Sequence, residues 1–325
     1  MQLKSGWIRL GGALLATLFC AVVASGALAA DKIRLGKAQG LGWTFLPADI
    51  GVEQGFFAKY GIDAQIVVLA GDAKVQQVLA SKSIEFGLGS GPGMAFAAKG
   101  SPAIAVAAYA GPPRNISTIV RADSPIKNVA DLRGKLIGVS TVGSLTDWLA
   151  KQMAVQEGWG QSGVRTVPLG SITASLAALK AHQVDASALA TEAGYQLAEK
   201  GEARIVVGME RYAPHFITHV VFARKDILAA NPGLIERFLK GFFASIAFMK
   251  THKAQTVATA ERLLKQSPRV ASETYDYEIS MLTDDGRFDP QAVAVLKQSF
   301  VEMGTLDKKP ADDELFTTHF LPVKP

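Results

Sequence analysis

A weak internal repeat, with a spacing of about 100 residues, constrains this chain more than any other feature. The segment LASKSIEFG (79–87) resembles LKAHQVDAS (179–187). Two further pairs follow the same order: IRLGKAQ (33–39) with KLIGVST (135–141), and EQGFFAKYGIDAQIVVLAG (53–71) with QEGWGQSGVRTVPLGS (156–171). Any two α/β stretches look somewhat alike, but three pairs at nearly one offset favour two copies of one structural unit.

Each copy alternates short apolar runs with helical patterns, which is typical of βαβ units and mainly parallel sheets flanked by helices. A chain of this length favours two domains. The sequence therefore predicts a two-lobed α/β protein, with lobe 1 formed by 30–114 plus 224–325 and lobe 2 by 122–214. The chain must pass between the lobes twice, and the strand-like segments 115–121 and 215–223 are the expected hinge crossings.

Residues 1–29 have the features of a cleavable signal peptide. Lys4 and Arg9 precede an apolar run from Leu10 to Val23, and the small-x-small pattern of a cleavage site ends at Ala29. This apolar run is too short for a membrane-spanning helix, and no later stretch reaches about 18 uninterrupted apolar residues. We expect export to the periplasm and no membrane span in the mature protein.

Cysteine usage and charge narrow the class of protein. The one cysteine, Cys20, lies in the predicted signal peptide, so the mature chain holds no disulfide, unlike a disulfide-rich extracellular scaffold. Loss of Lys4 and Arg9 lowers the formal net charge from +5 to +3. The remaining basic residues are interspersed with acidic ones and form no basic run, so no nucleic-acid partner is expected. We expect a monomer.

The repeat also predicts where a ligand would bind. In open parallel sheets, ligands lie beyond the carboxyl ends of the strands. The expected loops there are 39–45, 70–74 and 87–93 in lobe 1, and 140–146, 170–175 and 188–194 in lobe 2. Six loops that face one another across a cleft would enclose one small molecule.

The loop STVGSLT (140–146) is rich in hydroxyls, and two interpretations of it coexist. Ser144 and Asp147 fit a capping box that only begins a helix. Alternatively, the free amides of that helix start, with Ser140 and Thr146, receive a polar group of a ligand. We favour the cap for Ser144 and ligand contact for Ser140 and Thr146.

Trp43 stands among glycines in the loop at 39–45. An aromatic face is a common wall of a small-molecule site, so we expect Trp43 to line the cleft, with burial in the core as the alternative.

Enzyme motifs fail where the loops resemble them. In GLGSGPG (87–93), Pro92 occupies the place of the third glycine of a dinucleotide-binding loop. His215 and His219 have the spacing of a zinc pair, but Phe216 stands where H-E-x-x-H needs glutamate, and we expect both histidines to be structural or solvent-facing. No catalytic residue, metal site or cofactor is predicted.

Four segments carry a resemblance to a known family: ADIGVEQGFFAKYGID, LASKSIEFGLGSG, VADLRGKLIGVSTVGS and LKAHQVDASAL. They resemble the solute-binding proteins of ABC importers, in the nitrate/sulfonate/taurine and thiamine-precursor group, along the whole mature chain. That family usually has glycine before the acidic start of a strand in both lobes, whereas this chain has Lys82 and His182 near those places.

The resemblance implies a periplasmic binding protein fold (type II), in which two lobes close on one ligand and deliver it to a membrane permease with its ATPase. The loops and the resemblance together give these candidate ligand-binding residues: Gln39, Gly40, Leu41, Trp43, Thr44, Ser90, Gly91, Tyr109, Ser140, Ser144, Leu145, Thr146, Thr173 and Thr191.

Other functions share this fold. A periplasmic sensory protein would bind the ligand without transport. A pyrimidine-precursor synthesis enzyme would bring a cysteine-rich stretch, which the mature chain lacks, and a transcription regulator would bring a helix-turn-helix instead of a signal peptide.

The loops also limit the kinds of ligand that the cleft can hold. Lys74 is the one basic residue in the six loops, and Arg114 lies just beyond the next strand. A doubly charged oxyanion would need more than that. We expect a small organic molecule, such as a sulfonate, a carboxylate or a pyrimidine-like compound, that is neutral or carries one negative charge, with an apolar part against Trp43.

Overall fold

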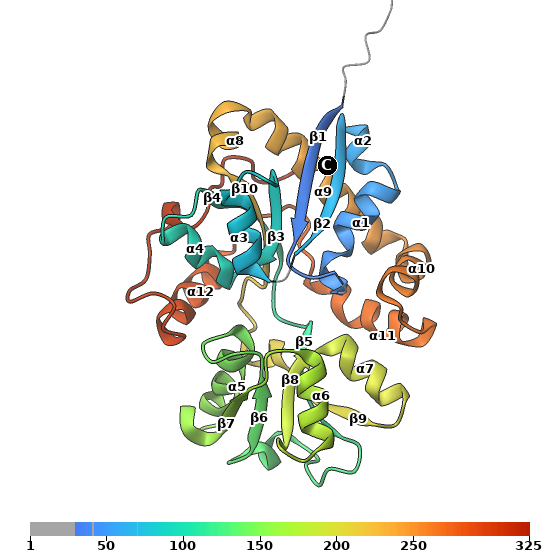
Figure 1. Cartoon of the computed structure of the whole chain (residues 1–325), viewed down its shortest axis with the longest axis vertical. Helices are drawn as coiled ribbons and strands as arrows, with labels where there is room; N and C mark the ends of the chain where they lie inside the picture. The colour runs from blue at the N-terminus through green and yellow to red at the C-terminus, as the bar shows by residue number, and fades with distance from the viewer. Residues whose placement is uncertain (1–29, 41, 70) are drawn as a thin grey trace, which may run out of the picture.

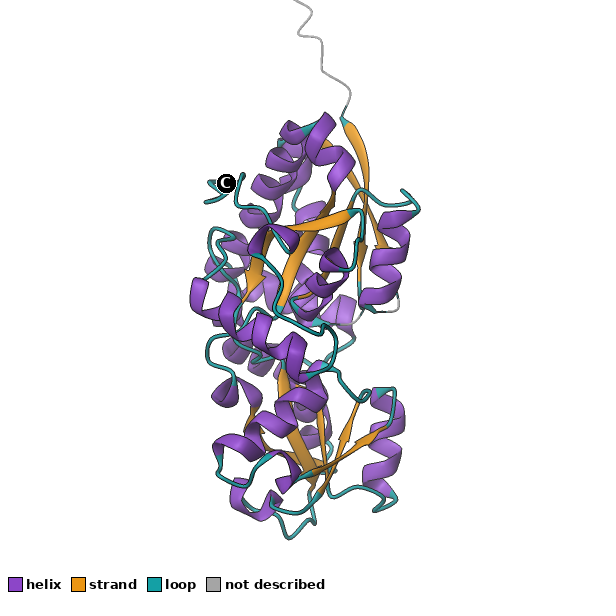
Figure 2. Cartoon of the chain, turned by 90° about the vertical axis from the view of Figure 1, so that its left-hand side faces the viewer, coloured by secondary structure: helices purple, strands orange, loops and turns teal. Residues whose placement is uncertain are grey.

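The computed structural model describes residues 30–40, 42–69 and 71–325. It shows two lobes, each built on one five-stranded sheet with helices around it (Figures 1 and 2). The two-lobed α/β fold predicted from the repeat is confirmed. The predicted signal peptide and the candidate residue Leu41 lie outside the described residues. No described helix has both the length and the apolar character needed to cross a membrane.

The two sheets have one topology. The strand order is β2-β1-β3-β10-β4 in lobe 1 and β7-β6-β8-β5-β9 in lobe 2. In each sheet, one strand (β10 or β5) runs antiparallel to both of its neighbours, and the others are parallel. The lobe 1 strands are β1 (Asp31–Lys37), β2 (Ile62–Val68), β3 (Phe86–Ser90), β4 (Ala103–Ala110) and β10 (His219–Arg224). The lobe 2 strands are β5 (Ile116–Arg121), β6 (Leu136–Val139), β7 (Arg165–Pro168), β8 (Ala186–Ala190) and β9 (Ala203–Gly208).

The segments predicted as hinge crossings, 115–121 and 215–223, contain the antiparallel strand β5 and most of the antiparallel strand β10. β5 lies in the lobe 2 sheet and β10 in the lobe 1 sheet. The chain changes lobe just before each of them, in the stretches 111–115 and 209–218. Bending of the molecule at these stretches stays a prediction.

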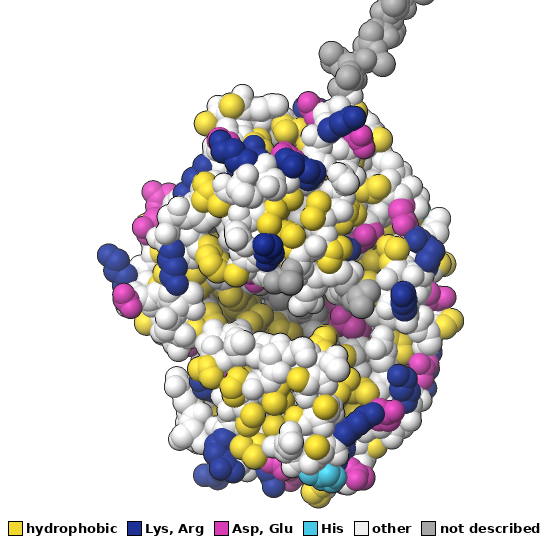
Figure 3. All heavy atoms as spheres, viewed as in Figure 1, with side chains coloured by type: hydrophobic (Ala, Val, Ile, Leu, Met, Phe, Trp, Pro, Cys, Tyr) yellow, Lys and Arg dark blue, Asp and Glu magenta, His cyan; other side chains and the backbone are white. Residues whose placement is uncertain are grey.

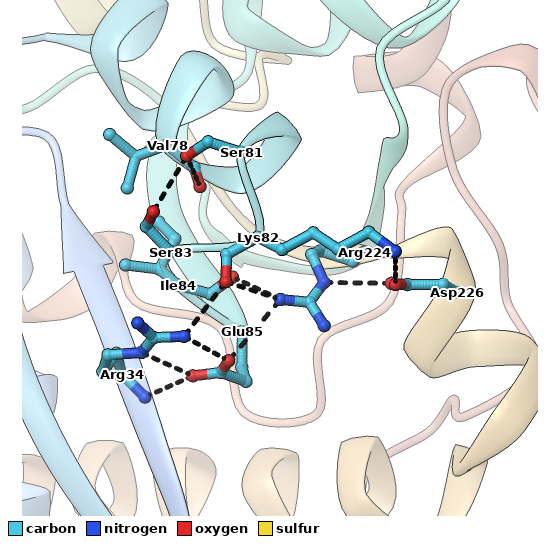
Figure 4. A network of polar contacts seen from close by, with 9 residues as sticks. All are labelled: Arg34, Val78, Ser81, Lys82, Ser83, Ile84, Glu85, Arg224 and Asp226. Carbon is cyan, nitrogen blue, oxygen red and sulfur yellow. Dashed lines mark hydrogen bonds and ion pairs between the residues drawn. The ribbon is translucent and has the colours of Figure 1, made fainter.

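The repeat extends to single hydrogen bonds at the amino ends of the parallel strands. In lobe 1, the Glu85 carboxylate accepts the Arg34 N–H at 2.7 Å, while the Glu85 N–H donates to the Arg34 carbonyl at 3.0 Å (Figure 4). In lobe 2, the Asp185 carboxylate accepts the Leu136 N–H and the Asp185 N–H donates to the Leu136 carbonyl, both at 2.9 Å. In each lobe, the acidic residue just before a parallel strand (Glu85 before β3, Asp185 before β8) thus bonds the neighbouring strand (β1 or β6) through both its carboxylate and its N–H.

Lys82 and His182 are also equivalent. Their φ angles are 59° and 58°, in the left-handed region that favours glycine. Each follows a helix end and turns the chain toward that acidic residue and the strand that follows it. The departure from glycine noted in the sequence therefore falls where a side chain is strained, and the fold is kept.

The helices of lobe 1 come from both ends of the chain, whereas lobe 2 uses the middle (Figure 1). The lobe 2 helices are α5 (Leu145–Gln156), α6 (Ile172–Lys180) and α7 (Thr191–Glu199). The lobe 1 helices are α1 (Leu46–Glu53), α2 (Phe56–Lys59), α3 (Asp72–Ala80), α4 (Ala95–Ala98), α8 (Lys225–Ala230), α9 (Pro232–Thr251), α10 (Lys253–Leu264), α11 (Pro268–Glu278) and α12 (Pro290–Glu302).

Helix α9 anchors the lobe 1 core. It begins at a cap, because the Asn231 side chain accepts the Leu234 N–H at 3.2 Å. The Phe238 ring stacks between Phe57 and Phe86, with ring centroids 5.3 and 4.0 Å away. Such aromatic pairs contribute about 0.5–1.5 kcal/mol each beyond their buried area. This packing fixes α9 against β3, one of the strands that lead to the cleft.

Candidate functional site

The carboxyl ends of the parallel strands in both sheets face one cleft between the lobes, which Figure 3 shows as a hollow. The cleft holds a cavity of about 700 Å³, a size that fits a small organic molecule. All six predicted loops contribute to its wall. The candidate residues that line it are Gln39, Thr44, Ser90, Ser140, Ser144, Leu145 and Thr146.

The hydroxyls of 140–146 form a connected chain at the start of α5. Ser144 is the N-cap of this helix, and its Oγ accepts the Asp147 N–H at 3.3 Å. The Ser144 Oγ lies 3.0 Å from the Thr146 Oγ1. The Thr146 Oγ1 accepts the Ser140 N–H at 3.0 Å and lies 3.0 Å from the Ser140 Oγ.

Counting hydrogens along this chain identifies its free donor. Each hydroxyl has one hydrogen and two lone pairs. The Thr146 oxygen accepts the Ser140 N–H, so it accepts from one neighbouring hydroxyl and donates to the other. The Ser144 oxygen already accepts from Asp147, and from the Thr141 N–H at 3.4 Å. Ser144 is therefore the donor to Thr146, Thr146 donates to Ser140, and the Ser140 hydroxyl hydrogen is left for the cavity.

On the opposite wall, Asp72 holds the loop of Ser90. Asp72 is the first residue of α3, and its carboxylate accepts the Ser90 N–H at 2.8 Å and the Ser90 hydroxyl at 2.5 Å. The Ser90 Oγ also accepts the Gly93 N–H at 3.2 Å. Burial raises the pKa of Asp72, and the two bonds from Ser90 oppose that shift. The Ser90 hydroxyl is thus used within the protein, while Asp72 carries its carboxyl group to the cavity wall.

Thr44, Asn115 and His219 meet on the stretch of wall nearest the crossings. The His219 Nε2 lies 3.1 Å from the Thr44 Oγ1 and 3.4 Å from the Asn115 Nδ2. Burial lowers the pKa of His219 to about 4, so the ring is neutral at neutral pH. The Phe45 ring contacts the imidazole edge-on, with centroids 5.0 Å apart. The Asn115 Oδ1 is buried without a hydrogen-bond partner among the described residues.

Glu192 and Glu278 bring two carboxyl groups together across the lobe boundary. Glu192 is the second residue of α7 and lines the cavity, whereas Glu278 ends α11, which packs on α7. Burial raises the pKa of Glu192, and burial together with the charge of Glu192 raises the pKa of Glu278 well above its usual range. Neither oxygen of Glu278 finds a donor among the described residues. A proton held between the two carboxyl groups supplies the missing donor.

Several candidate residues lie away from the cavity wall. Trp43, expected there, is 1 % exposed and packs edge-on against Tyr275 of α11, with centroids 6.3 Å apart. Tyr109 is fully buried and stacks behind His219. The Thr191 hydroxyl donates to the Arg114 carbonyl at 2.7 Å. The aromatic wall is instead formed by Phe45 and Phe96.

The remaining candidates also take backbone or surface positions. Gly91 donates its N–H to the Thr218 carbonyl at 2.9 Å, and a Cβ there would meet the Ile217 carbonyl oxygen at 1.9 Å. Gly40 is half-buried, and Thr173 is exposed on α6, outside the cavity wall. Gly91 thus positions the crossing segment instead of facing the cavity.

Among the wall residues that sequence reasoning missed are Asp72, Asn115, Glu192 and His219. His219 was expected to be structural or solvent-facing; it is 7 % exposed, its ring contacts Thr44, and it also borders the cavity. A usable signal existed for Asp72 and Glu192, since both stand in predicted loops. His215, in contrast, is exposed, with its Nδ1 3.8 Å from Asp289. Within the described ranges, no three His, Cys, Asp or Glu side chains gather as a metal site would require.

Solved structures share this fold. The periplasmic aliphatic sulphonate binding protein SsuA from Escherichia coli superposes with a TM-score of 0.76 at 20% identity, over 90% of this chain and 94% of that chain. The alkanesulfonate-binding protein SsuA from Xanthomonas axonopodis, bound to MOPS, gives 0.70 at 17% identity, over 86% and 94%. The desulfurization enzyme DSZB gives 0.64 at 18% identity, over 90% and 97%. The fold therefore serves binding proteins and an enzyme.

Sequence comparison gives the family. A putative binding protein of Brucella abortus is 25% identical over 272 residues, which cover 81% of this chain and 83% of that protein. The family model described as NMT1/THI5 like matches residues 44–256, more than half of the chain and both lobes. This chain belongs to the NMT1/THI5 like family.

Proposed function

We propose that this protein is a periplasmic solute-binding protein that captures one small organic molecule between its lobes and delivers it to an ABC importer. The observation that carries the proposal is the wall of the cavity, which is built from both lobes and from the residues beside both crossings. A molecule bound there touches both halves, so its binding energy favours the closed form. The sulphonate binding proteins of the same fold, and the putative binding proteins of Brucella, support this function.

The partners follow from this function. The closed, loaded form would dock on a membrane permease that works with an ATPase. A sensory protein that binds the solute and contacts a receptor is the alternative. Transport by the permease reconstituted with its ATPase, in the presence of this protein, separates the two.

Binding rather than catalysis is supported by how the hydroxyls at the start of α5 are used, whereas two other hydroxyls of the wall, Ser90 and Thr44, contact the Asp72 carboxylate and the His219 ring. Ser140, Ser144 and Thr146 are bonded to one another and to backbone amides. No described histidine or carboxylate accepts their protons, so no activated nucleophile arises there. Sulfonates, carboxylates, pyrimidine-like compounds and amines are the solute classes to test, and each is assayed for turnover because the desulfurization enzyme DSZB has the same fold.

The test is a thermal unfolding panel on the mature protein, followed by mass spectrometry of any solute released from protein purified from its own periplasm. A solute at 100 times its Kd adds about 2.7 kcal/mol to the free energy of unfolding. For a protein of this size that is a rise of several degrees in Tm. Absence of any released solute, with no shift across all classes, would contradict the proposed function, and conversion of a bound compound would indicate an enzyme.

A further inference from the structure

The cavity wall has an unusual balance of charge for a protein that shares its fold with sulfonate-binding proteins. Among the described residues that line it, Asp72 and Glu192 are acidic, and none is lysine or arginine. The one imidazole, His219, is neutral at neutral pH. Lys37 is close in sequence to the wall, but it is buried and paired with Asp49 at 2.7 Å. A sulfonate would therefore enter without a cationic partner.

Backbone amides are the other common ligands of an oxyanion, and here many are already used. Five amides at the carboxyl-end loops donate to oxygens of the protein itself. These donors are the N–H groups of Ser90, Gly91, Ser140, Gly143 and Gly170. An anion would have to displace these bonds, and each loss leaves a buried acceptor unpaired, which is costly.

Helix N-termini also border the cavity, and their dipoles favour anions. Each is equivalent to about half a positive charge. Three of these helices carry a carboxylate in the first turn: Asp72 at the first residue of α3, Asp147 at the third of α5 and Glu192 at the second of α7. Asp147 is paired with Lys151 at 2.8 Å, but at the starts of α3 and α7 an anion would meet carboxyl oxygens of the protein, which oppose the attraction of those two dipoles.

Two hydrogen-bond acceptors near the cavity have no donor within the described ranges. The Asn115 Oδ1 and the Glu192 Oε2 are buried atoms without hydrogen-bond partners in the described part of the chain. They lie close together on the lobe 2 side of the wall, since the N–H of Thr191, the residue before Glu192, donates to the Asn115 carbonyl at 3.1 Å. Both need hydrogens that a ligand can bring.

Given the proposed solute-binding function, on which this step rests, we propose that the cavity selects a small organic molecule whose polar part donates hydrogen bonds and carries a positive charge, such as an amine or amidine. It disfavours sulfonates and other ionised anions. The Ser140 hydroxyl hydrogen serves the one acceptor that such a molecule carries, and Phe45 and Phe96 contact its apolar part. This departs from the expectation from the sequence, in which the ligand is neutral or carries one negative charge.

The experiment reads the charge of the cavity directly. Residues 30–325 hold no cysteine, so Ala73→Cys, on the cavity wall next to Asp72, gives the mature protein a single thiol. Its rates with trimethylammonium-ethyl and sulfonato-ethyl methanethiosulfonate are measured, and each is divided by the rate with the neutral methyl reagent. Ala80→Cys, an exposed alanine at the far end of the same helix, is the matched control.

The expected ratio of cation to anion rates is at least about fivefold higher at position 73 than at position 80, as nearby unit charges predict. In the Ala73→Cys background, Asp72→Asn and Glu192→Gln should each lower that ratio toward the control value. A ratio at position 73 equal to or below the control would overturn the inference. Solute binding is read separately by Tm and mass spectrometry, so a low ratio in a protein that binds a solute rejects the charge preference alone.

Discussion

The indole of Trp148 in lobe 2 donates a hydrogen bond from its Nε1 to the Glu302 carboxylate of lobe 1, with 2.7 Å between the two atoms. The Gln152 amide of the same helix, α5, donates to the same oxygen at 2.9 Å. The far face of lobe 2 meets lobe 1 through α7 and α11. Contacts between the lobes therefore lie on both flanks of the cleft, and each is a place where closure can be weakened selectively.

Trp148→Phe should favour the open form. The phenyl ring keeps the stacking on Phe216, whose centroid lies 5.0 Å from the indole, but it loses the N–H donor to Glu302. A hydrogen bond to a charged group contributes about 1.5–3 kcal/mol. Small-angle scattering of the ligand-free protein should show a larger radius of gyration. Gln298→Ala, which removes a bond to Glu302 within α12 only, is the control, and equal profiles for all three proteins would show that this contact does not hold the lobes.

The Glu192–Glu278 pair predicts a stability that falls as pH rises. Both carboxyl groups have raised pKa values in the folded protein, so the folded state holds a proton that the unfolded state releases. This stabilisation is complete below the unfolded carboxyl pKa of about 4.3 and is lost as pH rises toward the raised value. Tm should therefore decrease between pH 5 and pH 8.

Glu278→Gln is the decisive variant for that pH dependence. Its amide supplies a permanent donor to Glu192, so Tm at pH 8 should rise and the slope should flatten. The neighbouring Tyr195 stays neutral over this pH range, because burial and the charges of Glu278, Glu273 and Glu210 raise its pKa to about 12. Glu236→Gln, exposed on α9, should leave the slope unchanged. If Tm of Glu278→Gln depends on pH as steeply as Tm of the parent protein, the proton is not held between Glu192 and Glu278.

The three hydroxyls of the α5 start should respond differently to alanine. Ser144→Ala removes the cap and should cost about 1 kcal/mol of stability. Ser140→Ala should leave Tm nearly unchanged but weaken binding of the native solute by about 0.5–1.5 kcal/mol. Thr146→Ala should do both to a lesser degree, because Thr146 relays the hydrogen bond. Calorimetric titration together with thermal unfolding separates these outcomes, and equal affinity in Ser140→Ala would limit the loop to capping.

His182→Gly should stabilise the protein. The residue adopts φ 58°, a conformation that costs an L-residue about 1 kcal/mol or more. Ala181→Gly, one residue earlier at φ −81°, offers no such relief and should destabilise. Urea unfolding of the pair measures the difference. If both glycines lower the midpoint, the left-handed turn carries no strain that glycine can remove.

The lobes should close on the solute by bending at 111–115 and 209–218. Scattering with and without the native solute should show compaction, since these stretches are where the chain changes sheet. Identical profiles at saturation would indicate a rigid protein that binds without closure.

The sequence predicted the fold because the repeated segments make the same contacts in both lobes. Glu85 and Asp185 bond equivalent strands, and their segments look alike for that reason. It also placed the six loops, since these follow from strand order alone. It failed for Trp43, because the cover of that side chain is Tyr275, on a helix outside the repeat. It did not place His219 on the cavity wall, because the partners of that ring, Thr44 and Asn115, are distant from it in sequence.

Asn115 and His219 stand where the chain passes from one lobe to the other, so a solute that touches them contacts the wall beside the stretches where bending is predicted. The same contacts would then determine both how tightly a solute binds and how far the lobes close. A compound that contacts these two side chains poorly should bind with lower affinity. It should also stabilise the closed form of the lobes less. Among analogues of the native solute, affinity and the angle of closure should therefore vary together. A permease that binds only the closed form would then select the same solutes as the cavity, before it contacts the solute itself.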